Sequence, residues 1–368
     1  MKILQIILVF FLIGISLSIL PLYSFQLSFL KAVNEQYHKS NVVLSPLSAH
    51  QALSFVSNGA RGETQQNLVK VLGKNNQIEV NRYNQKILES VMSETNLKIA
   101  NAIFTTFTPN ESFLQIAKKF KAYSDKLIST QQVNDWCAAN TENKITQIVD
   151  SVERITMVVL NAIYFKSTWK YQFDKNRTLK EEFLNSDGSK PIVEMMNQRT
   201  NFLFAETDDY QAIQLPYKDS KISALVILPS ESFEINSVIS MLTDEKLSIL
   251  INSMEMKRID LKLHKFEIEF ETVLNKPLSE MGLTTAFDPS KADFSNITDH
   301  VKLFIELIIQ KAYIKVDEEG TEAAAVTAIM TRSASSHRNM HINRPFLFFL
   351  MNNELNQIVF ATKIEHLK

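Results

Sequence analysis

Hydrophobic residues follow a helical spacing through most of the first half of the chain. They recur at every third or fourth position, as on the buried face of a helix. Ser45 followed by Pro46 is a typical helix start, with serine as the cap and proline in the first turn. Gly59 and Gly73 mark two helix ends. The pattern predicts helices over residues 28–37, 46–59, 64–72, 82–93, 113–123 and 133–149.

Strand patterns dominate the second half of the chain. Residues 157–165 form a continuous apolar run, which is typical of a strand covered on both faces. Helices first and strands later indicate an α+β domain and not an array of parallel βαβ units. No tract rich in Pro, Gly or Ser divides the chain, so one large domain fits it as well as two. Shorter apolar or alternating runs predict strands over residues 97–105, 201–205, 212–216, 223–228, 259–270, 312–316, 346–351 and 358–364, with helices near 235–254 and 273–281.

The N-terminus has the composition of a targeting segment. Lys2 precedes an uncharged, largely apolar run over residues 3–30. Ser16 and Ser18 form a small-x-small site, so we expect a signal peptide over residues 1–18 that is cleaved after Ser18. The run is also long enough for an uncleaved membrane anchor. No basic cluster flanks it, which favours cleavage and a secreted, extracellular protein without stable membrane association.

Composition excludes several classes of function. The net charge is −1 and the 39 basic residues are scattered, so we expect no nucleic-acid partner. The single cysteine, Cys137, can form neither an internal disulfide nor a metal site with a second thiol. Its apolar neighbours indicate a small core residue and not a reactive thiol. Only 7 glycines occur in the chain, so each marks a position where a side chain would not fit.

The chain contains no motif of a known catalytic or cofactor site. It lacks an H-E-x-x-H zinc motif, a G-x-S-x-G elbow, a Walker loop and a dinucleotide fingerprint. Its 7 histidines are dispersed. A catalytic triad is recognised by geometry and not by order, but no oxyanion motif supports one here. We therefore expect neither an enzyme nor a metal or other cofactor.

Residues 317–327, D-E-E-G-T-E-A-A-A-V-T, are the most informative stretch. Gly320 supplies backbone freedom, and the small residues after it could lie exposed as a loop or enter a sheet as a strand. Taken alone, the stretch also fits an alanine-rich surface helix. It resembles the hinge of the reactive-centre loop of serpins, protease inhibitors that bait and trap their target. The resemblance places the hinge at Glu318, Glu319, Gly320, Thr321, Glu322, Ala323, Ala324 and Ala325.

Four further stretches resemble the serpin family and keep the family's order. They are residues 41–53 (NVVLSPLSAHQAL), 59–64 (GARGET), 161–173 (NAIYFKSTWKYQF) and 344–350 (RPFLFFL). They are similar, in turn, to a buried helix with its entry, the turn after it, the central strand of the large sheet, and the strand after the reactive loop. The resemblance implies one serpin domain over residues 19–368, with three β-sheets, eight or nine helices and an exposed reactive-centre loop over residues 318–344.

The resemblance also implies two polar regions inside the fold. The shutter, which in relatives lies under the strands that open, comprises Ser45, Ser48, Asn161 and Gln310. Gln310 stands where the family usually has histidine; it can donate and accept hydrogen bonds but cannot titrate, so we expect no pH sensitivity from it. The breach, at the top of the large sheet, comprises Trp169, Lys265 and Glu318. We expect Lys265 and Glu318 to pair; the alternative is two solvated surface charges.

The implied function is suicide-substrate inhibition of serine proteases. In the family, the protease cleaves the exposed loop, forms an acyl-enzyme and is trapped as the loop inserts into the large sheet. Insertion buries alternate loop residues. Glu322 and Arg332 fall on the other face, which favours an inhibitor over a carrier. The buried set is neutral and free of proline: Thr321, Ala323, Ala325, Thr327, Ile329, Thr331 and Ser333.

The family's loop spacing selects the bait bond. With Glu318 as the first position, the seventeenth is Ala334, so the expected reactive bond is Ala334–Ser335. Counting back from Arg344 gives the same place. Alanine suits the shallow pocket of an elastase-like serine protease. Arg332–Ser333 is the alternative bond and would suit a trypsin-like protease.

Other functions within the family stay open at this point. One alternative is a non-inhibitory serpin that acts as a carrier, chaperone or interaction protein, and another is a cross-class inhibitor of cysteine proteases. We expect a monomer that can form loop–sheet polymers. Asn110, Asn176 and Asn296 stand in N-x-S/T sequons. An asparagine-rich chain produces such sequons by chance, so they neither support nor oppose secretion.

Overall fold

Two large β-sheets organise the fold. A computed structural model describes residues 23–321, apart from residues 93 and 95, and residues 338–368. Within these ranges the chain forms nine α-helices and three sheets, of nine, five and two strands. The predicted α+β class and its implied sheet and helix numbers are therefore confirmed.

The nine-stranded sheet gathers segments from both ends of the chain. Most neighbouring pairs are antiparallel, but β10 and β14 run parallel. Its order is β1 (Val42–Leu44), β16 (Gln357–Ile364), β15 (Phe346–Asn352), β9 (Ile222–Pro229), β8 (Tyr210–Pro216), β7 (Ile192–Glu206), β10 (Glu255–His264) and β14 (Arg338–Ile342), with β6 (Leu179–Glu182) paired to β7.

The five-stranded sheet contains the strands that matter for function. Its two central neighbours, β4 and β12, run parallel, and every residue of β4 is buried, as its continuous apolar run predicts. A two-stranded sheet of β5 (Ser167–Thr168) and β13 (Gly320–Thr321) lies at the end of this sheet. The order of the five strands is β11 (Phe266–Val273), β12 (Leu307–Val316), β4 (Met157–Phe165), β2 (Leu97–Thr105) and β3 (Tyr123–Lys126).

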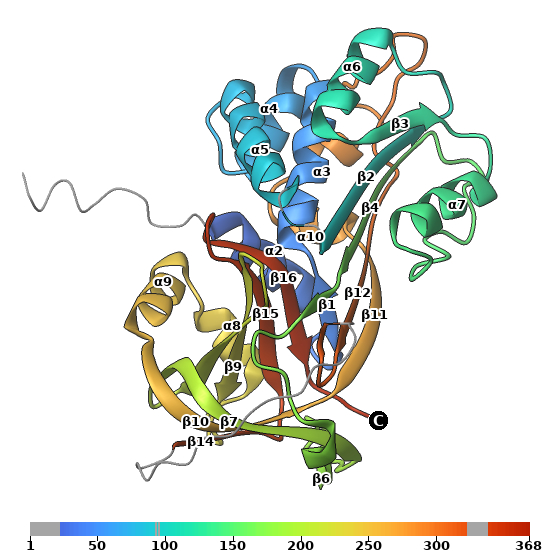
Figure 1. Ribbon diagram of the computed structural model, residues 1–368. Coiled ribbons are helices and arrows are strands. Elements are labelled where there is room, and N and C mark those ends of the chain that lie inside the picture. Colours follow the sequence, from blue (N-terminus) through green and yellow to red (C-terminus); the bar gives the residue numbers. More distant parts are fainter. Residues whose placement is uncertain (1–22, 93, 95, 322–337) are drawn as a thin grey trace, which may run out of the picture.

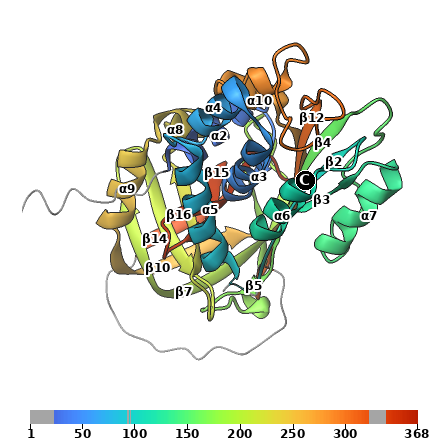
Figure 2. The same ribbon diagram turned by 90° about the horizontal axis from the view of Figure 1, so that it is seen from above.

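Helices gather at one end of the molecule and the nine-stranded sheet forms the other (Figure 1). Seen from above, α7 lies outside β2 and β3, on the side away from α5 (Figure 2). Within the described ranges, none of the helices is both long and apolar enough to cross a membrane. The helices are α2 (Ser24–Asn34), α3 (Pro46–Gly59), α4 (Gly62–Val71), α5 (Gln77–Met92), α6 (Glu111–Phe120), α7 (Thr130–Asn140), α8 (Ile235–Met241), α9 (Asp244–Ser253) and α10 (Asn275–Glu280), with 3₁₀ turns η1 (Lys175–Arg177) and η2 (Thr285–Phe287).

Helix α3 forms as its sequence predicts. The Ser45 hydroxyl accepts a hydrogen bond from the Ser48 N–H at 3.2 Å, and Pro46 occupies the first turn. Almost the whole helix is buried between the two large sheets and the other helices.

Cys137 on α7 is also fully buried, and burial raises the pKa of its thiol to about 12. It is therefore a core residue, as its neighbours indicate.

The predicted helix over residues 133–149 is too long. Helix α7 ends at Asn140, and the chain then turns back with Asn143 in a left-handed conformation (φ 57°). The Asn134 side chain accepts a hydrogen bond from the Ile148 N–H at 2.8 Å, which fixes the returning segment against the helix. Apolar spacing continues through this segment, so the sequence pattern alone did not mark the end.

The predicted helix over residues 235–254 is two helices, α8 and α9. The Thr243 hydroxyl accepts a hydrogen bond from the Lys246 N–H at 3.2 Å and so begins a new helix.

The predicted strand over residues 259–270 is likewise two strands in different sheets, because the chain changes sheet at Lys265. The apolar positions shift phase there, from Ile259, Leu261 and Leu263 to Phe266, Ile268 and Phe270, with His264 and Lys265 between them. The prediction overlooked this break in the alternation.

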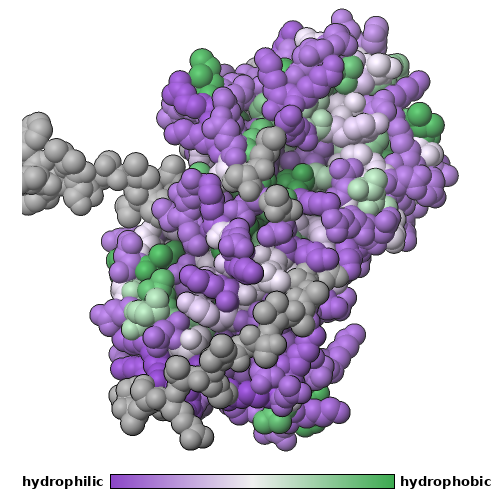
Figure 3. Space-filling model, viewed as in Figure 1, coloured by the Kyte–Doolittle hydropathy of each residue, from purple (hydrophilic) through white to green (hydrophobic). Residues whose placement is uncertain are grey.

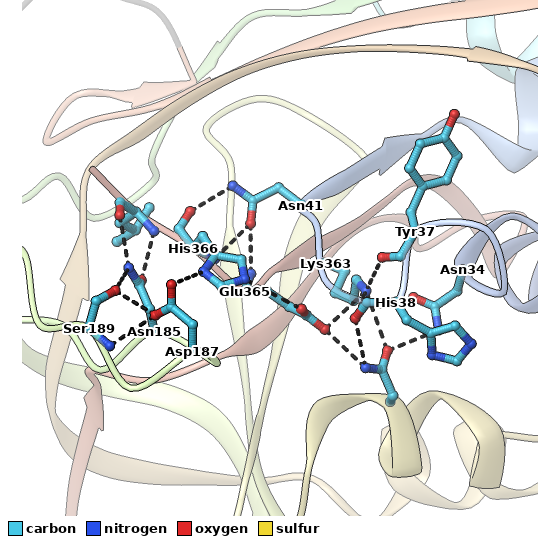
Figure 4. A network of polar contacts seen from close by, with 12 residues as sticks. Asn34, Tyr37, His38, Asn41, Asn185, Asp187, Ser189, Lys363, Glu365 and His366 are labelled. Atoms are coloured by element: carbon cyan, nitrogen blue, oxygen red, sulfur yellow. Dashed lines mark hydrogen bonds and ion pairs between the residues drawn. The ribbon is translucent and has the colours of Figure 1, made fainter.

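A buried ion pair anchors the last strand to distant parts of the chain (Figure 4). The Lys363 ammonium and the Glu365 carboxylate are 3.0 Å apart, and both side chains are inaccessible to solvent. The same ammonium donates to the carbonyls of Tyr37 (2.8 Å) and His38 (3.2 Å). Burial lowers the pKa of Lys363, while Glu365 opposes that shift. The pair therefore ties β16 to the segment between α2 and β1.

Replacing Glu365 with glutamine should destabilise the protein by about 3 kcal/mol, because the Lys363 ammonium would stay buried without its counter-charge. The measurement is the guanidinium unfolding midpoint. Glu354→Gln is the matched control, since Glu354 pairs with Lys221 on the surface of the turn between β15 and β16. Equal midpoints for the two variants would contradict this account of the pair.

Candidate functional site

The candidate site is the hinge at the end of β12, where the chain turns back on itself. The Asp317 N–H donates to the Gly320 carbonyl at 2.9 Å. The Asp317 carboxylate accepts from the N–H groups of Glu319 (2.9 Å) and Gly320 (3.3 Å). An aspartate that bonds the backbone two residues on stabilises a tight turn. These bonds reverse the chain direction, so β13 runs back along the sheet.

Strand β13 pairs antiparallel with β5, which directly follows β4. Gly320 lies opposite Thr168, and Thr321 lies opposite Ser167. A Cβ atom on Gly320 would lie 2.1 Å from the Ser167 carbonyl oxygen and 2.6 Å from the Thr168 Cα. Glycine is required here by this close approach, in addition to the backbone freedom expected from the sequence. The hinge thus already contacts the strand segment that continues β4.

Thr321, the first inward-facing residue of the hinge, is held in an aromatic pocket. Its side chain is fully buried, and its hydroxyl lies 2.6 Å from the Tyr217 hydroxyl. The Tyr217 ring stacks on Trp169, with centroids 4.4 Å apart. The Trp169 indole N–H donates to the Asp317 carbonyl at 3.0 Å, and its backbone N–H donates to Glu319 at 2.8 Å. Trp169 therefore holds the turn through hydrogen bonds to Asp317 and Glu319. This position agrees with its expected place in the breach.

The predicted ion pair between Lys265 and Glu318 is present. The two charged groups are 3.2 Å apart, and the Glu318 side chain is 6 % exposed. The Thr178 hydroxyl donates to the same carboxylate at 2.7 Å, and Lys265 also contacts Glu194 at 3.1 Å. Two solvated charges, the alternative interpretation, do not describe this arrangement.

The protonation states of this pair follow from its contacts. Burial raises the pKa of the Glu318 carboxyl, but the Thr178 hydroxyl and the Lys265 ammonium outweigh it and hold that pKa below its usual value. Burial lowers the pKa of Lys265, but the bonds to Glu194 and Glu318 raise it overall. Both groups therefore carry full charge at neutral pH.

A second ion pair holds the outer side of the hinge. The Lys175 ammonium bonds the Glu319 carboxylate, whose side chain is 12 % exposed. Lys175 lies in η1, a few residues before Thr178. The Phe173 N–H donates to the Glu318 carbonyl at 2.9 Å. The segment over residues 173–178, which we call the hinge clasp, thus contacts both glutamates of the hinge.

The predicted shutter residues meet deep between β4, β12 and α3. Gln310 on β12 lies directly opposite Asn161 on β4. Its amide N–H₂ donates to the Asn161 side-chain oxygen at 2.5 Å and to the Ser45 carbonyl at 2.9 Å. Its amide oxygen accepts from the Ser45 N–H at 2.8 Å. Gln310 therefore joins the two central strands to the start of the buried helix.

Asn161 extends the same network to helix α3 and to strand β2. Its amide nitrogen donates to the Ser48 hydroxyl and, at 2.6 Å, to the Asn101 side-chain oxygen on β2. The Ser45 hydroxyl donates to the Val359 carbonyl at 2.7 Å. None of these side chains titrates, so the network contributes no pH dependence of its own, as the replacement of histidine by Gln310 implies.

Three contacts were missed by reasoning from the sequence. Nothing in the sequence distinguishes Thr178, or Tyr217 just after the end of a predicted strand, as a hinge contact. Only the fold brings both residues to the hinge. Asn101 carried a weak signal, because it is a polar residue in the middle of an apolar strand. No group of His, Cys, Asp or Glu side chains could hold a metal ion within the part of the chain that the structure describes.

Part of the predicted site lies outside the described residues. This applies to the rest of the hinge and to both candidate reactive bonds, namely Glu322, Ala323, Ala324, Ala325, Arg332, Ser333, Ala334 and Ser335. Their assignments stay predictions.

Replacing Lys265 with methionine should lower stability by about 1–3 kcal/mol at pH 7, because it leaves the buried Glu318 carboxylate without its cation. The measurement is the thermal midpoint together with the rate of polymerisation on heating. Because the pKa of Glu318 is lowered by folding, the stabilisation is full above its unfolded pKa and is lost as the pH falls through the folded value. The difference between wild type and variant should therefore shrink below about pH 4.

The control for that experiment is Lys190→Met, since Lys190 and its partner Glu182 are both more than half exposed. This variant should match wild type at both pH values. If Lys265→Met also matches wild type in midpoint and polymerisation rate, the ion pair does not stabilise the hinge.

Comparison with known proteins agrees with this geometry. The family model described as "Serpin (serine protease inhibitor)" matches residues 22–367. Human Serpin B3 is 33% identical over 368 aligned residues, which cover 89% of this chain and 94% of the relative. Glia-derived nexin of Rattus norvegicus is 31% identical, with 91% of this chain and 90% of the relative covered.

Solved structures show the same fold. The native state of the thermophilic serpin tengpin superposes with a TM-score of 0.87 at 30% identity, covering 93% of this chain and 92% of that one. Thyroxine-binding globulin in complex with thyroxine superposes with a TM-score of 0.86 at 25% identity, covering 95% and 98%. The match therefore extends over nearly the whole chain in sequence and in structure. The chain belongs to the serpin family.

Proposed function

We propose that this serpin is a suicide-substrate inhibitor of serine proteases. The observation that carries the proposal is the start of the hinge: Thr321 is fully buried and pairs with β5, the segment that continues β4, next to the end of its neighbour β12. The loop strand of an inhibitor would enter at this place. An insertion that has begun here needs only small, neutral residues to continue, and the sequence after Thr321 supplies them.

The reaction proposed for the loop starts as ordinary proteolysis. The hydroxyl of the protease's catalytic serine attacks the carbonyl carbon of Ala334, and the amine of Ser335 leaves with the C-terminal part of the chain. The N-terminal part then stays linked to the protease as an ester. Its insertion between β4 and β12 carries the protease to the far end of the sheet and distorts its active site before water can hydrolyse the ester.

The energy of insertion is sufficient for this step. A new strand would form about a dozen ladder hydrogen bonds at roughly 1 kcal/mol net each, or on the order of 10 kcal/mol. That sum is comparable with the stability of an entire domain. The ladder between β4 and β12 and the shutter bond between Gln310 and Asn161 must break as the strands separate. The inserted strand pairs on both of its edges and so replaces that ladder, and the dozen bonds are the net gain.

Hinge composition supports an inhibitor over a carrier. The relatives include both a nexin and thyroxine-binding globulin, whose structure contains thyroxine, so family membership alone does not decide the activity. The residues expected to enter the sheet here are neutral and free of proline.

We also propose that the chain is secreted after cleavage of residues 1–18, on the strength of its apolar N-terminal run and the Ser16–Ser18 site.

The bait bond predicts which protease is trapped. Incubation with pancreatic elastase should give an adduct that survives denaturing electrophoresis and should release a peptide that begins at Ser335. Ala334→Arg should move the preference to trypsin, since a basic side chain suits its deep acidic pocket. The mass of the released peptide is the measurement. A peptide that begins at Ser333 would identify Arg332 as the bait, and cleavage without an adduct by elastase, trypsin and a wider panel would favour a non-inhibitory serpin.

Thr321→Arg should convert the inhibitor into a substrate. The arginine would have to enter a fully buried pocket against Tyr217, so insertion would be slower than hydrolysis of the ester. The fraction of protease trapped per cleaved serpin should fall by about tenfold or more, which corresponds to a change of about 1.4 kcal/mol in the competing barriers. Gel densitometry of adduct and cleaved serpin gives this ratio.

Glu322→Arg is the matched control, because residue 322 is expected on the opposite face of the inserted strand. This variant also introduces an arginine, one residue further along the loop. It should leave the fraction of trapped protease nearly unchanged. If Thr321→Arg traps protease as well as Glu322→Arg does, burial of alternate residues is not required.

A further inference from the structure

We propose that Asn176 carries an N-linked glycan and that the hinge clasp is therefore a modification site. Asn176, Arg177 and Thr178 form an N-x-T sequon, the acceptor signal for this modification on surface segments of secreted proteins. The inference rests on the secretion proposed above. The structure separates this sequon from the other two, which the sequence alone could not do.

Asn296 is excluded by its contacts. Its side-chain amide nitrogen donates to the carbonyls of Asn58 (3.3 Å) and Ala60 (3.1 Å), and its oxygen accepts from Arg61. Both hydrogens of the amide are thus used inside the fold, and Thr298 of this sequon is buried. A sugar on this nitrogen would remove one of the two bonds and would need space that the segment over residues 58–61 occupies.

Asn110 is less accessible than Asn176. It is half-buried at the start of α6, and its backbone N–H donates to the Ile297 carbonyl at 2.7 Å. Its serine, Ser112, is already part of the helix. Partial burial and this backbone bond at a helix start leave less room for a sugar than at an exposed asparagine.

Asn176 is exposed to solvent, unlike Asn110 and Asn296. Its side chain is exposed in η1, and both its backbone N–H (3.0 Å) and its side-chain N–H (3.2 Å) donate to the Asp174 carboxylate. Among the described residues, the second amide hydrogen has no acceptor. The surface around β6, into which η1 leads, mixes hydrophilic residues with the exposed side chains of Leu179 and Ile192 (Figure 3). A bulky, solubilising group fits such a position.

The modification leaves the local contacts intact. The side-chain nitrogen of Asn176 forms a bond to the anomeric carbon of an oligosaccharide donated by a lipid-linked sugar diphosphate. The bond between that carbon and the phosphate oxygen breaks, the lipid diphosphate leaves, and one amide proton is released. The remaining N–H can still donate to Asp174. Glycosylation and the folded turn are therefore compatible.

The sequon shares a residue with the hinge. Thr178 is both the third residue of the sequon and the donor to the Glu318 carboxylate. Its neighbour Lys175 bonds Glu319. Removing the sequon through Thr178 would therefore disturb the hinge, whereas removing it through Asn176 would not. This difference allows the glycan and the hinge contact to be tested separately.

The test is expression of the full chain in a cultured eukaryotic cell and analysis of the medium. Enzymatic removal of N-glycans in heavy-oxygen water converts each occupied asparagine to labelled aspartate, and peptide mapping then identifies it. We expect label at residue 176 and none at residue 296. Asn176→Gln should lose that glycan and keep the thermal midpoint of the enzymatically deglycosylated wild type. Thr178→Ser should keep both the glycan and the midpoint, and Thr178→Ala should lose both.

A second arm separates this proposal from secretion. Residues 19–368 are expressed behind an unrelated signal peptide that is known to be cleaved. If this protein reaches the medium without label at residue 176, the site is overturned whatever the natural signal does. If only the natural chain stays with the cell, its secretion is overturned, and peptide mapping of the cell fraction then decides the glycan: absence of label at residue 176 there overturns it as well.

Discussion

Contact between β4 and β12 is the constraint on which the rest of this structure depends. The two strands are parallel neighbours in the middle of the five-stranded sheet, and parallel pairs are slightly less stable per residue than antiparallel ones. Gln310 and Asn161 bridge them, and Ser45 ties that bridge to the buried helix α3. The native sheet is thus closed by a ladder and a small uncharged network, and the proposed insertion would replace both with a new strand.

Close packing and ion pairs hold the start of the hinge against β5. Gly320 fits against the backbone of β5 only because it lacks a side chain, and Thr321 occupies the pocket formed by Tyr217 and Trp169. Glu318 and Glu319 are fixed by cations and by the hinge clasp. These contacts fix the hinge as far as Thr321. In the proposed mechanism, the charges at the turn hold the uncleaved loop, and the small residues that follow allow it to enter the sheet.

Sequence reasoning succeeded where a local signal was strong. Helix α3 has a serine cap and proline in its first turn, and β4 is one apolar run, so both were predicted closely. The shutter and breach residues were located by family resemblance and do meet in the fold. The change of sheet at Lys265 leaves a phase shift in the apolar pattern, which the prediction overlooked. Sequence reasoning failed outright where only tertiary contacts decide: at the contacts of Tyr217 with the hinge, and at the end of α7, which a side chain from within the helix fixes. No periodicity records such events.

Thermal stability before and after cleavage of the loop tests the central claim most directly. A metalloprotease that nicks the loop within residues 318–344 would release the strand without trapping the protease. If the strand then enters between β4 and β12, about 10 kcal/mol of new ladder bonds should raise the unfolding midpoint by roughly 10–20 °C. Hydrogen exchange along β4 and β12 should slow at the same time. An unchanged or lower midpoint would mean that the cleaved loop stays outside the sheet, and the account would be wrong.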